Sequence, residues 1–399
     1  MKKKRKIVCF TIIYAIATIV LIILVISLGK KAWQEESCNK NQLGNSQYSI
    51  LILGDTSFRD YCESRSIIDC NEKEFSLFFS KIFENFSLLL NESDYSIANL
   101  EAPITTLKES PYGNNKSFVE SDNPQVTPYI FKKYKISAVS LANNHMMDFK
   151  EEGLKDTLRN LGQAKISLFG AGFSSIDAAE PLNIDISSNG KTRKIFVFSA
   201  FDNRTSYEQK YNFYAKKNKA GVLSIDDSAL WENIRQIRKK EPESFIILLI
   251  HWGEDYEWMS QRQKQLATQI TKSSDVNLII GHGSHTLQQV DFFNDTYVVY
   301  GIGNFFFNSI GRYSSMSGFP YSFITRLIIQ SQNNSEKIFL RLYPFKSDNA
   351  ASGFKPRLVN SIEFKEVLKV LSDKSANTTS VNDFVTGIDR YGYYIEFDI

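Results

Sequence analysis

Histidine and cysteine are both rare in this chain, which has four of each among its 399 residues. None of the cysteines, Cys9, Cys38, Cys62 and Cys70, shows the Cys-x-x-Cys spacing of a zinc site. Cys62 and Cys70 are near enough in sequence to form a disulfide, but free or buried thiols fit the sequence equally well. The 47 basic residues are interspersed with 44 acidic ones and form no basic stripe, so we expect no nucleic-acid partner.

A long uncharged run stands near the N-terminus. Residues 7–29 carry no charge and lie between the basic segment 1–6 and the pair Lys30-Lys31. A run of this length can cross a bilayer as a helix, and no small-residue cleavage site or lipobox-like cysteine follows it. We therefore predict a cytoplasmic basic tail (1–6), a transmembrane signal anchor (7–29) and a polar linker (30–47). The protein would then cross the cell membrane once, with the rest of the chain on the extracytoplasmic side. A cleaved signal peptide remains the alternative.

From residue 48 onwards, strand-like and helix-like segments alternate. Strands are predicted at 48–53, 95–100, 136–141, 194–201, 244–250, 276–280 and 297–302, and helices at 74–90, 124–134, 151–162, 228–239 and 260–273. This alternation predicts an α/β fold with a largely parallel central sheet. The segment 320–345 predicts an antiparallel hairpin, and the last fifty residues hold one helix (362–371) and one strand-like run (391–397).

All four histidines follow strand-like runs, in the motifs ANNH, HWG and GHGSH. Other polar residues also follow such runs, and together they form the set Asp55, Glu101, Asn143, Asn144, His145, His251, His282, His285 and Asn304. Ligands of open α/β sheets bind outside the carboxyl ends of the strands, so we expect these side chains on one rim. Carboxylate, amide and imidazole groups without thiolates are the ligand mix of a dinuclear Mn, Fe or Zn hydrolase centre.

Each of these residues also has a purely structural interpretation. Asp55 could cap the segment that follows it, and Glu101 could be a solvated loop carboxylate. The pair Asn143-Asn144 could form a turn, and His251 could be a packed histidine at a strand end. His282 is harder to explain in this way because glycine flanks it on both sides. A shared metal site accounts for all of these residues at once.

A series of motifs resembles the CapA family of poly-γ-glutamate capsule-synthesis proteins, a branch of the calcineurin-like metallophosphoesterase superfamily. The motifs are GDTSF, ANLEAPIT, SLANNHMMD, GAG, HWGEDYE, IIGHGSHTLQ and YGIGNFFFN, in that order along the chain. The resemblance covers residues 48–345 and implies a four-layer α/β/β/α sandwich. Residues 346–399 would be a C-terminal extension that packs on the same domain. Members of the family are typically anchored by one N-terminal helix.

The resemblance also implies roles for the strand-end residues. Asp55 and His285 match first-metal ligands, and Glu101 stands where a metal-bridging carboxylate is expected. Second-metal ligands are matched by Asn144, His251 and His282, and His145, beside Asn144 in the catalytic motif, matches the histidine that donates a proton to the leaving oxygen.

Two departures from the family pattern concern the first metal. Ser57 replaces the histidine of the superfamily's Asp-x-His motif, and GHGSH replaces a motif that is typically closer to GHHPH. The counterpart of the superfamily's ligand is therefore either His282 or the missing histidine at Gly283. A weak or empty first metal site is the expected consequence.

Two functions fit these features. In the first, a membrane-anchored CapA-like protein of capsule or surface-polymer biosynthesis or export hydrolyses a phosphoester, amide or ester bond with one or two divalent metal ions. In the alternative, the protein is a non-catalytic scaffold or polymer-binding subunit beside a membrane synthase or export subunit. In both, the partner is an anionic surface polymer or its precursor, and the loop 108–123 is a candidate substrate contact.

Overall fold

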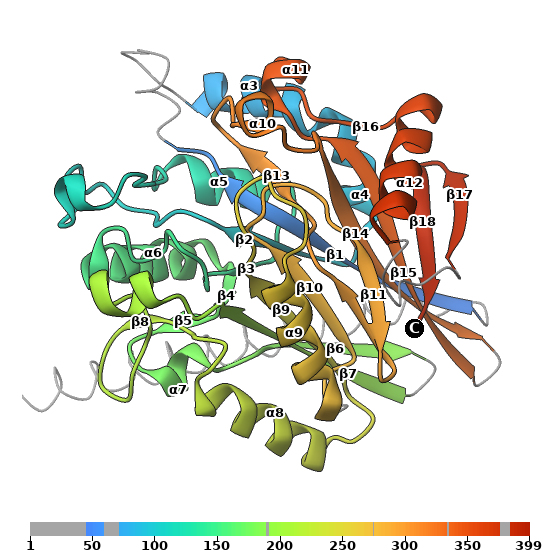
Figure 1. Cartoon of the computed structure of the whole chain (residues 1–399), viewed down its shortest axis with the longest axis horizontal. Helices are drawn as coiled ribbons and strands as arrows, with labels where there is room; N and C mark the ends of the chain where they lie inside the picture. The colour runs from blue at the N-terminus through green and yellow to red at the C-terminus, as the bar shows by residue number, and fades with distance from the viewer. Residues whose placement is uncertain (1–44, 60–71, 189–190, 274, 333–334, 376–383) are drawn as a thin grey trace, which may run out of the picture.

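The computed structural model describes residues 45–59, 72–188, 191–273, 275–332, 335–375 and 384–399 (Figure 1). The predicted membrane anchor, most of the predicted linker and all four cysteines lie outside these residues. Among the residues that are described, no helix has both the length and the apolar character needed to span a membrane.

Two large mixed sheets form the centre of the described chain. The larger has the strand order β17 (Val385–Asp389), β18 (Gly392–Asp398), β15 (Ser335–Lys346), β14 (Tyr321–Gln332), β1 (Asn45–Ser57), β2 (Tyr95–Leu100), β3 (Ala138–Ser140) and β4 (Ser167–Phe169). It also includes β13 (Asn304–Phe307) beside β1 and β16 (Arg357–Leu358) beside β15. The smaller has the order β11 (Val290–Phe293), β12 (Thr296–Val299), β10 (Leu278–His282), β9 (Phe245–His251), β7 (Lys191–Phe201) and β6 (Leu182–Ser188). A short pair joins β5 (Ala171–Gly172) to β8 (Gly221–Val222).

The predicted α/β class is confirmed, but the prediction of one central, largely parallel sheet is wrong. The predicted strands are divided between two sheets. The smaller sheet has a parallel centre with antiparallel edges, whereas the larger is parallel from β1 to β4 and antiparallel from β1 through β14 to β17. Hydrophobic patterning reports that a strand is buried on both faces, and strands of both sheets meet that condition. The pattern therefore does not distinguish one sheet from two. The hairpin predicted at 320–345 is formed by β14 and β15.

Helices cover the outer faces of both sheets (Figure 1). On the larger sheet lie α3 (Glu72–Phe83), the turn η1 (Glu84–Phe86), α4 (Ser87–Glu92), α5 (Val126–Lys133) and α6 (Lys150–Ala164), so the predicted helix 74–90 is divided in three. On the smaller sheet lie α8 (Ser228–Lys240) and α9 (Gln261–Ile270). The helix α12 (Ser361–Ser375) packs at the edge of the core between the sheets. Shorter elements are η2 (Gly113–Asn115), α7 (Ser175–Ala178), η3 (Ser206–Lys210), η4 (Thr271–Ser273), α10 (Tyr313–Met316) and α11 (Asn349–Ser352).

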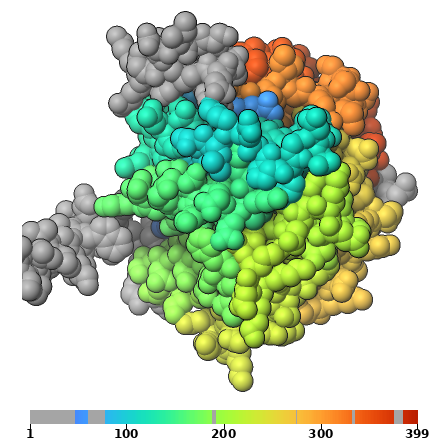
Figure 2. All heavy atoms as spheres, turned by 90° about the vertical axis from the view of Figure 1, so that its left-hand side faces the viewer, coloured from blue at the N-terminus to red at the C-terminus, as the bar shows by residue number. Residues whose placement is uncertain are grey.

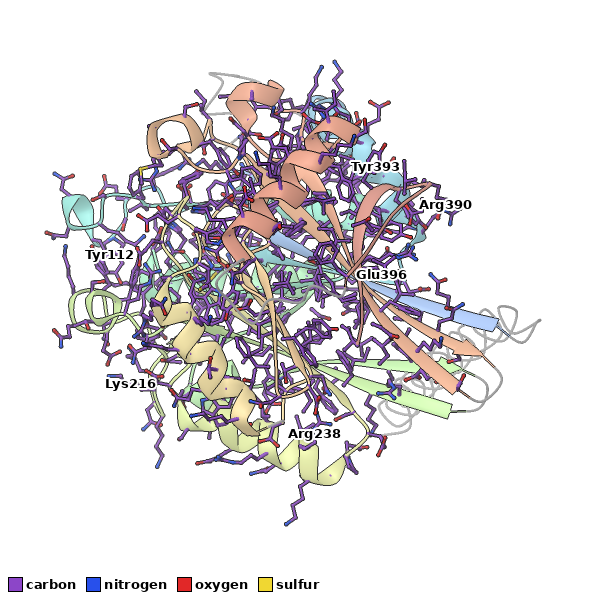
Figure 3. All side chains as sticks on the ribbon, turned by 45° about the vertical axis from the view of Figure 1, so that its right-hand side comes forward. Tyr112, Lys216, Arg238, Arg390, Tyr393 and Glu396 are labelled. Carbon is purple, nitrogen blue, oxygen red and sulfur yellow. The ribbon has the colours of Figure 1, made fainter. Side chains whose placement is uncertain are left out.

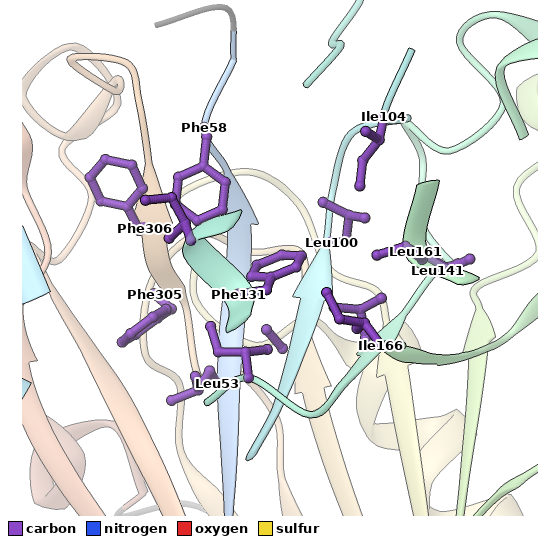
Figure 4. Packing of buried hydrophobic residues seen from close by; sticks show 14 of the residues in the cluster. Leu53, Phe58, Leu100, Ile104, Phe131, Leu141, Leu161, Ile166, Phe305 and Phe306 are labelled. Atoms are coloured by element: carbon purple, nitrogen blue, oxygen red, sulfur yellow. The ribbon is translucent and has the colours of Figure 1, made fainter. Parts of the chain in front are cut away.

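The side-chain alternation of β1 shows how the layers are built. Ile50 and Ile52 point into the core between the two sheets, whereas Leu51 and Leu53 point into the core beneath the outer helices. Successive side chains of a strand face opposite sides, so one strand serves both cores. Leu53 and Phe131 of α5 belong to the same outer core, as Figure 4 shows. The third core lies between the smaller sheet and α8 and α9. The layers therefore run helices, sheet, sheet, helices.

A short crossover between the sheets brings their strand ends together. The chain leaves β12 in the smaller sheet and enters β13 in the larger one after residues 300–303. On the way, the Gly303 carbonyl accepts a hydrogen bond from the Asp55 backbone N–H (3.0 Å). A Cβ atom at Gly54 would lie 1.7 Å from that carbonyl oxygen, so the close approach requires glycine. This contact fixes the end of β1 next to the ends of β9 and β10.

Candidate metal centre

Four of the predicted ligands come directly from strand ends. Asp55 lies near the end of β1, Glu101 follows β2, and His251 and His282 are the last residues of β9 and β10. Cα pairing places His251 and His282 side by side across neighbouring parallel strands. All four side chains are at least 95% buried. The chain therefore places imidazoles and carboxylates in one buried cluster, as the sequence predicts.

One group of candidate ligands consists of Asp55, His251 and His282. The Asp55 Oδ1 atom lies 3.4 Å from His282 Nδ1 and 3.9 Å from His251 Nδ1. The two Nδ1 atoms lie 3.0 Å apart, and all the ligand atoms of the group lie within 4.8 Å of one another. Such spacing fits three ligands that face one cation.

A second group consists of Asp55, Glu101 and His285, with ligand atoms again within 4.8 Å of one another. The Asp55 Oδ2 atom lies 3.4 Å from His285 Nδ1. The shared residue of the two groups is thus Asp55, whereas the family resemblance assigns the bridging position to Glu101. Glu101 nevertheless also lies near the first group, because its Oε1 atom is 3.9 Å from His251 Nε2.

The pKa values of the two carboxylates in this cluster are shifted in opposite directions. Burial alone would raise the pKa of Asp55, but hydrogen bonds from His282 and His285 lower it well below its usual range. Burial and the neighbouring Asp55 charge raise the pKa of Glu101 well above its usual range. Two like charges in a buried site are unfavourable together, so one carboxyl keeps its proton when no cation is near.

The pKa values of two histidines, His251 and His285, are also shifted in opposite directions. Burial lowers the pKa of His251 well below its usual range, so this imidazole is neutral and able to bind a metal. Burial would also lower the pKa of His285, but the Glu101 and Asp55 carboxylates raise it well above the usual value. A bound cation would favour the neutral, metal-binding form of both rings.

Several buried polar atoms of the cluster lack a hydrogen-bond partner. They are both Glu101 carboxylate oxygens, His282 Nε2 and Asn144 Oδ1. Buried polar atoms are nearly always paired, and an unpaired one calls for a missing partner such as an ion or water. These atoms are the donor types that Mn, Fe and Zn accept. The residues present therefore fit the predicted metal ions.

His145 has a different environment from the other three histidines. Its Nδ1 lies 2.7 Å from Asp148 Oδ2, and Asp148 Oδ1 forms a 2.8 Å ion pair with Lys116. All three side chains are at least 90% buried. The bond to Asp148 orients the ring and leaves Nε2 as the nitrogen available to a ligand. This position fits a proton donor and separates His145 from both ligand groups.

Several residues that the sequence analysis did not name as metal ligands hold this site in place. Asn99, on β2, donates from Nδ2 to Asp55 Oδ1 (2.8 Å), and Asn304 Oδ1 lies 2.7 Å from His285 Nδ1. The Gly283 N–H donates to Asp55 Oδ2 (3.0 Å). Gly283 has φ +99°, and a Cβ atom there would lie 2.8 Å from His251 Nε2. Asn304 was in the predicted strand-end set, whereas Asn99 lies within the quoted motif ANLEAPIT but was not singled out.

A cleft of about 820 Å³ opens next to the cluster. Its walls include Asn144, His145 and His285, together with the loop residues Lys116 and Phe118. Segments from opposite halves of the chain cover this side of the molecule and lie next to each other in Figure 2. They are joined by hydrogen bonds between Tyr112 and Tyr211 (2.9 Å) and between Tyr211 and Asn115 (2.8 Å). The predicted substrate loop 108–123 therefore does contribute to the cleft wall.

The cleft wall pairs its cations with anions and carries aromatic rings. Arg312 forms an ion pair with Asp255, and its guanidinium lies over the rings of Phe118 (5.0 Å) and Tyr256 (5.6 Å). Arg59 forms an ion pair with Glu120. Planar cations on aromatic rings present hydrogen-bond donors at a surface that also offers apolar contact. The wall is thus suited to a polar ligand rather than an apolar one.

These features define the protein as a two-sheet α/β protein with a histidine–carboxylate cluster at its strand ends. The chain belongs to the family of bacterial capsule synthesis proteins, PGA_cap, whose family model matches residues 49–309. The resemblance to the CapA family is therefore confirmed, and the chain belongs with proteins of capsule and poly-glutamate biosynthesis.

Individual relatives support the same family. The chain is 28% identical over 262 residues to the PGA biosynthesis protein CapA of Bacillus subtilis, covering 65% of each protein. It is also 28% identical to the capsule biosynthesis protein CapA of Bacillus anthracis, covering 57% of this chain and 54% of that protein. A probable polyglutamine synthesis accessory protein of Mycobacterium tuberculosis is 23% identical over 53% of this chain and 55% of its own length. The chain thus spans between about half and just under two thirds of these relatives.

Proposed function

We propose that this protein is a membrane-anchored, extracytoplasmic component of capsule or surface-polymer biosynthesis or export, of the poly-γ-glutamate type, with a metal-dependent hydrolase site of the metallophosphoesterase kind. The observation that supports the site is the sharing of Asp55 between two ligand groups, at the side of a cleft of about 820 Å³. The order of layers, helices, sheet, sheet, helices, agrees with a metallophosphoesterase-like sandwich.

In this proposal Asp55, His251, His282 and Asn144 hold one divalent ion, and Asp55, Glu101 and His285 hold a second. Mn, Fe and Zn suit these ligands. When bound, such ions supply an activated water and offset the negative charge that develops in the reaction.

The protein's own side chains supply the proton and orient the substrate in this proposal. The doubly protonated His145 ring delivers a proton from Nε2 to the leaving oxygen, and Asp148, which accepts from Nδ1–H, orients the ring for this transfer. Lys116 holds Asp148 in place through its 2.8 Å ion pair. Arg312 and the rings beneath it orient a polar substrate along the cleft wall. The proposed substrate is an anionic polymer or its precursor, cut at a phosphoester, amide or ester bond.

Metal content tests this proposal. The purified full-length protein is expected to contain Mn, Fe or Zn by elemental analysis, and His251→Ala is expected to lose it. His145→Ala is the matched control, because it removes an imidazole from the same region that is not in either ligand group. We expect this variant to retain metal and to lose hydrolysis. A wild-type protein that contains no metal and binds none on addition would contradict the proposal.

A second candidate function is a non-catalytic scaffold or polymer-binding subunit beside a synthase or export subunit. The observation that favours it is the loss of a ligand at Ser57, whose hydroxyl donates to Asp122 Oδ1 (3.0 Å). Polymer output from cells carrying Asp55→Ala together with His251→Ala distinguishes the two functions. Normal output supports the scaffold, whereas lost output from a folded double variant supports the hydrolase.

A further inference from the structure

A second polar cavity, of about 620 Å³, lies far from the candidate metal centre. Ser49 lines this cavity and precedes Asp55 by six residues on the same strand, which separates them by roughly 20 Å at about 3.3 Å per residue. Arg390 also lines it, and Figure 3 shows Arg390 on the opposite side of the molecule from Tyr112, which packs against the cleft-lining Tyr211. The cavity is therefore a separate location, with no residue in common with the metal centre.

The central feature of this cavity is a buried arginine. Arg326, on β14, is 4% exposed, and its Nε atom is buried without a hydrogen-bond partner. One terminal nitrogen donates to Ser49 Oγ (3.1 Å), and the guanidinium lies 4.7 Å from the centre of the Tyr391 ring. Stacking on a ring occupies one face of the guanidinium and leaves its in-plane donors available to other partners, of which Ser49 is one. Among the described residues, no carboxylate forms an ion pair with Arg326.

The other charges at the cavity already have partners. Glu92 forms an ion pair with Arg390 and accepts a hydrogen bond from the Tyr391 hydroxyl (2.6 Å). Asp94 accepts a hydrogen bond from the Ser49 backbone N–H (2.9 Å). Lys135 donates to the carbonyl of Asn91 (3.1 Å).

The charges of the lining therefore leave one positive charge in surplus. Three cations, Arg326, Arg390 and Lys135, face two carboxylates. Arg326 is the most buried of the three cations, and a buried charge without a partner is unfavourable. A ligand with one negative charge would neutralise the cavity.

We propose that this cavity is a binding site for a carboxylate group with a single negative charge, and that Arg326 is the cation that recognises it. A planar carboxylate matches the planar donor set of a guanidinium. A phosphate carries more negative charge at neutral pH and would leave an excess beside Asp94 and Glu92. Carboxylate is accordingly the oxyanion that fits both the geometry and the charge of the lining. The proposal does not depend on the metal centre.

Calorimetric titration of the full-length protein tests the site with three probes: N-acetylglycine, which has one carboxylate, its uncharged analogue N-acetylglycinamide, and inorganic phosphate. We expect saturable binding of N-acetylglycine at millimolar concentration and no binding of the amide. Arg326→Gln should weaken binding by about ten- to hundred-fold, since it removes a charge-assisted hydrogen bond. Asp94→Asn should tighten binding by about three- to ten-fold, because it removes a like charge while the amide oxygen can still accept from Ser49.

Arg312→Gln locates the binding, because Arg312 lines the cleft beside the metal centre and not this cavity. We expect it to leave N-acetylglycine binding unchanged. If Arg326→Gln fails to fold, the opposite effect of Asp94→Asn on the same titration still decides the question. Three results would each overturn the proposal. They are the absence of saturation below about 50 mM, equal binding of phosphate, and an affinity for N-acetylglycine that Asp94→Asn leaves unchanged. A cavity that holds only water gives the first of these results.

Discussion

Glu101→Gln should change the stability of the protein in opposite directions with and without metal. Glu101 is fully buried, and neither carboxylate oxygen has a hydrogen-bond partner. Burial and the adjacent Asp55 charge raise its pKa well above the usual range, so folding of the metal-free protein at neutral pH requires Glu101 to take up a proton, which costs stability. Glutamine has nearly the same volume and no charge. The variant should therefore be more stable than wild type when metal is absent.

The expected magnitudes follow from these contacts. An unsatisfied buried group costs about 1–3 kcal/mol, and the glutamine amide keeps part of that cost, so we expect a gain of about 1 kcal/mol in the free energy of unfolding. Metal at one hundred times its dissociation constant stabilises a protein by about 2.7 kcal/mol. The variant lacks one carboxylate of the second ligand group and should gain much less. The order of stabilities therefore reverses when metal is added.

Urea unfolding of chelator-treated protein, repeated with added Mn²⁺, measures the free energy of unfolding of wild type and variant without and with metal. Glu120→Gln is the matched control: Glu120 is a 4% exposed carboxylate at the same cleft, but it forms an ion pair with Arg59. Because Arg59 is partly exposed, this control should lose only about 0.5–1 kcal/mol and should keep the full response to metal. A metal-free Glu101→Gln protein that is less stable than wild type by more than about 1 kcal/mol, with its metal response intact, would refute the reasoning.

Three further predictions concern stability. Gly283→Ala forces a side chain into φ +99° and towards the His251 ring, and should cost about 1–3 kcal/mol in urea unfolding while also reducing metal content. Burial raises the pKa of Asp122 to about 7, so between about pH 4 and pH 7 the unfolded state releases a proton that the folded state retains, and stability falls as pH rises. From about pH 5 to about pH 8 the stability of wild type relative to Asp122→Asn should fall by about 3 kcal/mol, and a constant difference would count against the raised pKa. Asp148→Asn breaks the buried contacts with Lys116 and His145 and should cost about 3–5 kcal/mol by the same unfolding assay; a smaller loss would show that the ion pair is weak.

Strand positions were predictable where both faces of a strand are buried. The predicted strand 95–100 coincides with β2 (Tyr95–Leu100), and the predicted strand 244–250 differs from β9 by one residue at each end. The strand β6 was missed although Leu182, Ile184 and Ile186 alternate and are buried, so its signal was present. The strand β17 is mostly exposed and shows no alternation, so it gave no signal. Sheet membership was not predictable, because only residues 300–303 separate β12 in one sheet from β13 in the other.

The expectation that polar residues at strand ends share one rim predicted the cluster, but it did not predict the side chains that hold the cluster's residues in position. Parallel strands that end at the same edge explain the pairs Asp55 with Glu101 and His251 with His282, and the crossover at residues 300–303 brings the two pairs together. Lys116 reaches His145 from a loop that carries no periodic pattern, so no sequence rule placed it there. Asp148 lies within the quoted motif SLANNHMMD, but its role depends on the turn that returns it to the His145 ring. Side chains that act through tertiary contacts are the part that sequence patterns leave undetermined.

The two departures from the family motifs have local structural causes. Ser57 donates to the buried Asp122, which also accepts from the Phe58 and Arg59 backbones, so its side chain belongs to a loop-stabilising network. At Gly283 the space that a side chain would need is taken by the His251 ring.

The candidate ligands that are present therefore form two groups with different donor types. Asp55 with His251 and His282 is rich in imidazole, which suits Zn or Fe, whereas Asp55 with Glu101 and His285 is rich in carboxylate, which suits the harder Mn. In the proposed metal centre, the loss of the first-motif histidine thus shifts the preference of one group from imidazole-binding to oxygen-binding ions. Because Asp55 belongs to both groups, occupation of one group lowers the negative charge left for the other, and the second ion should bind more weakly than the first.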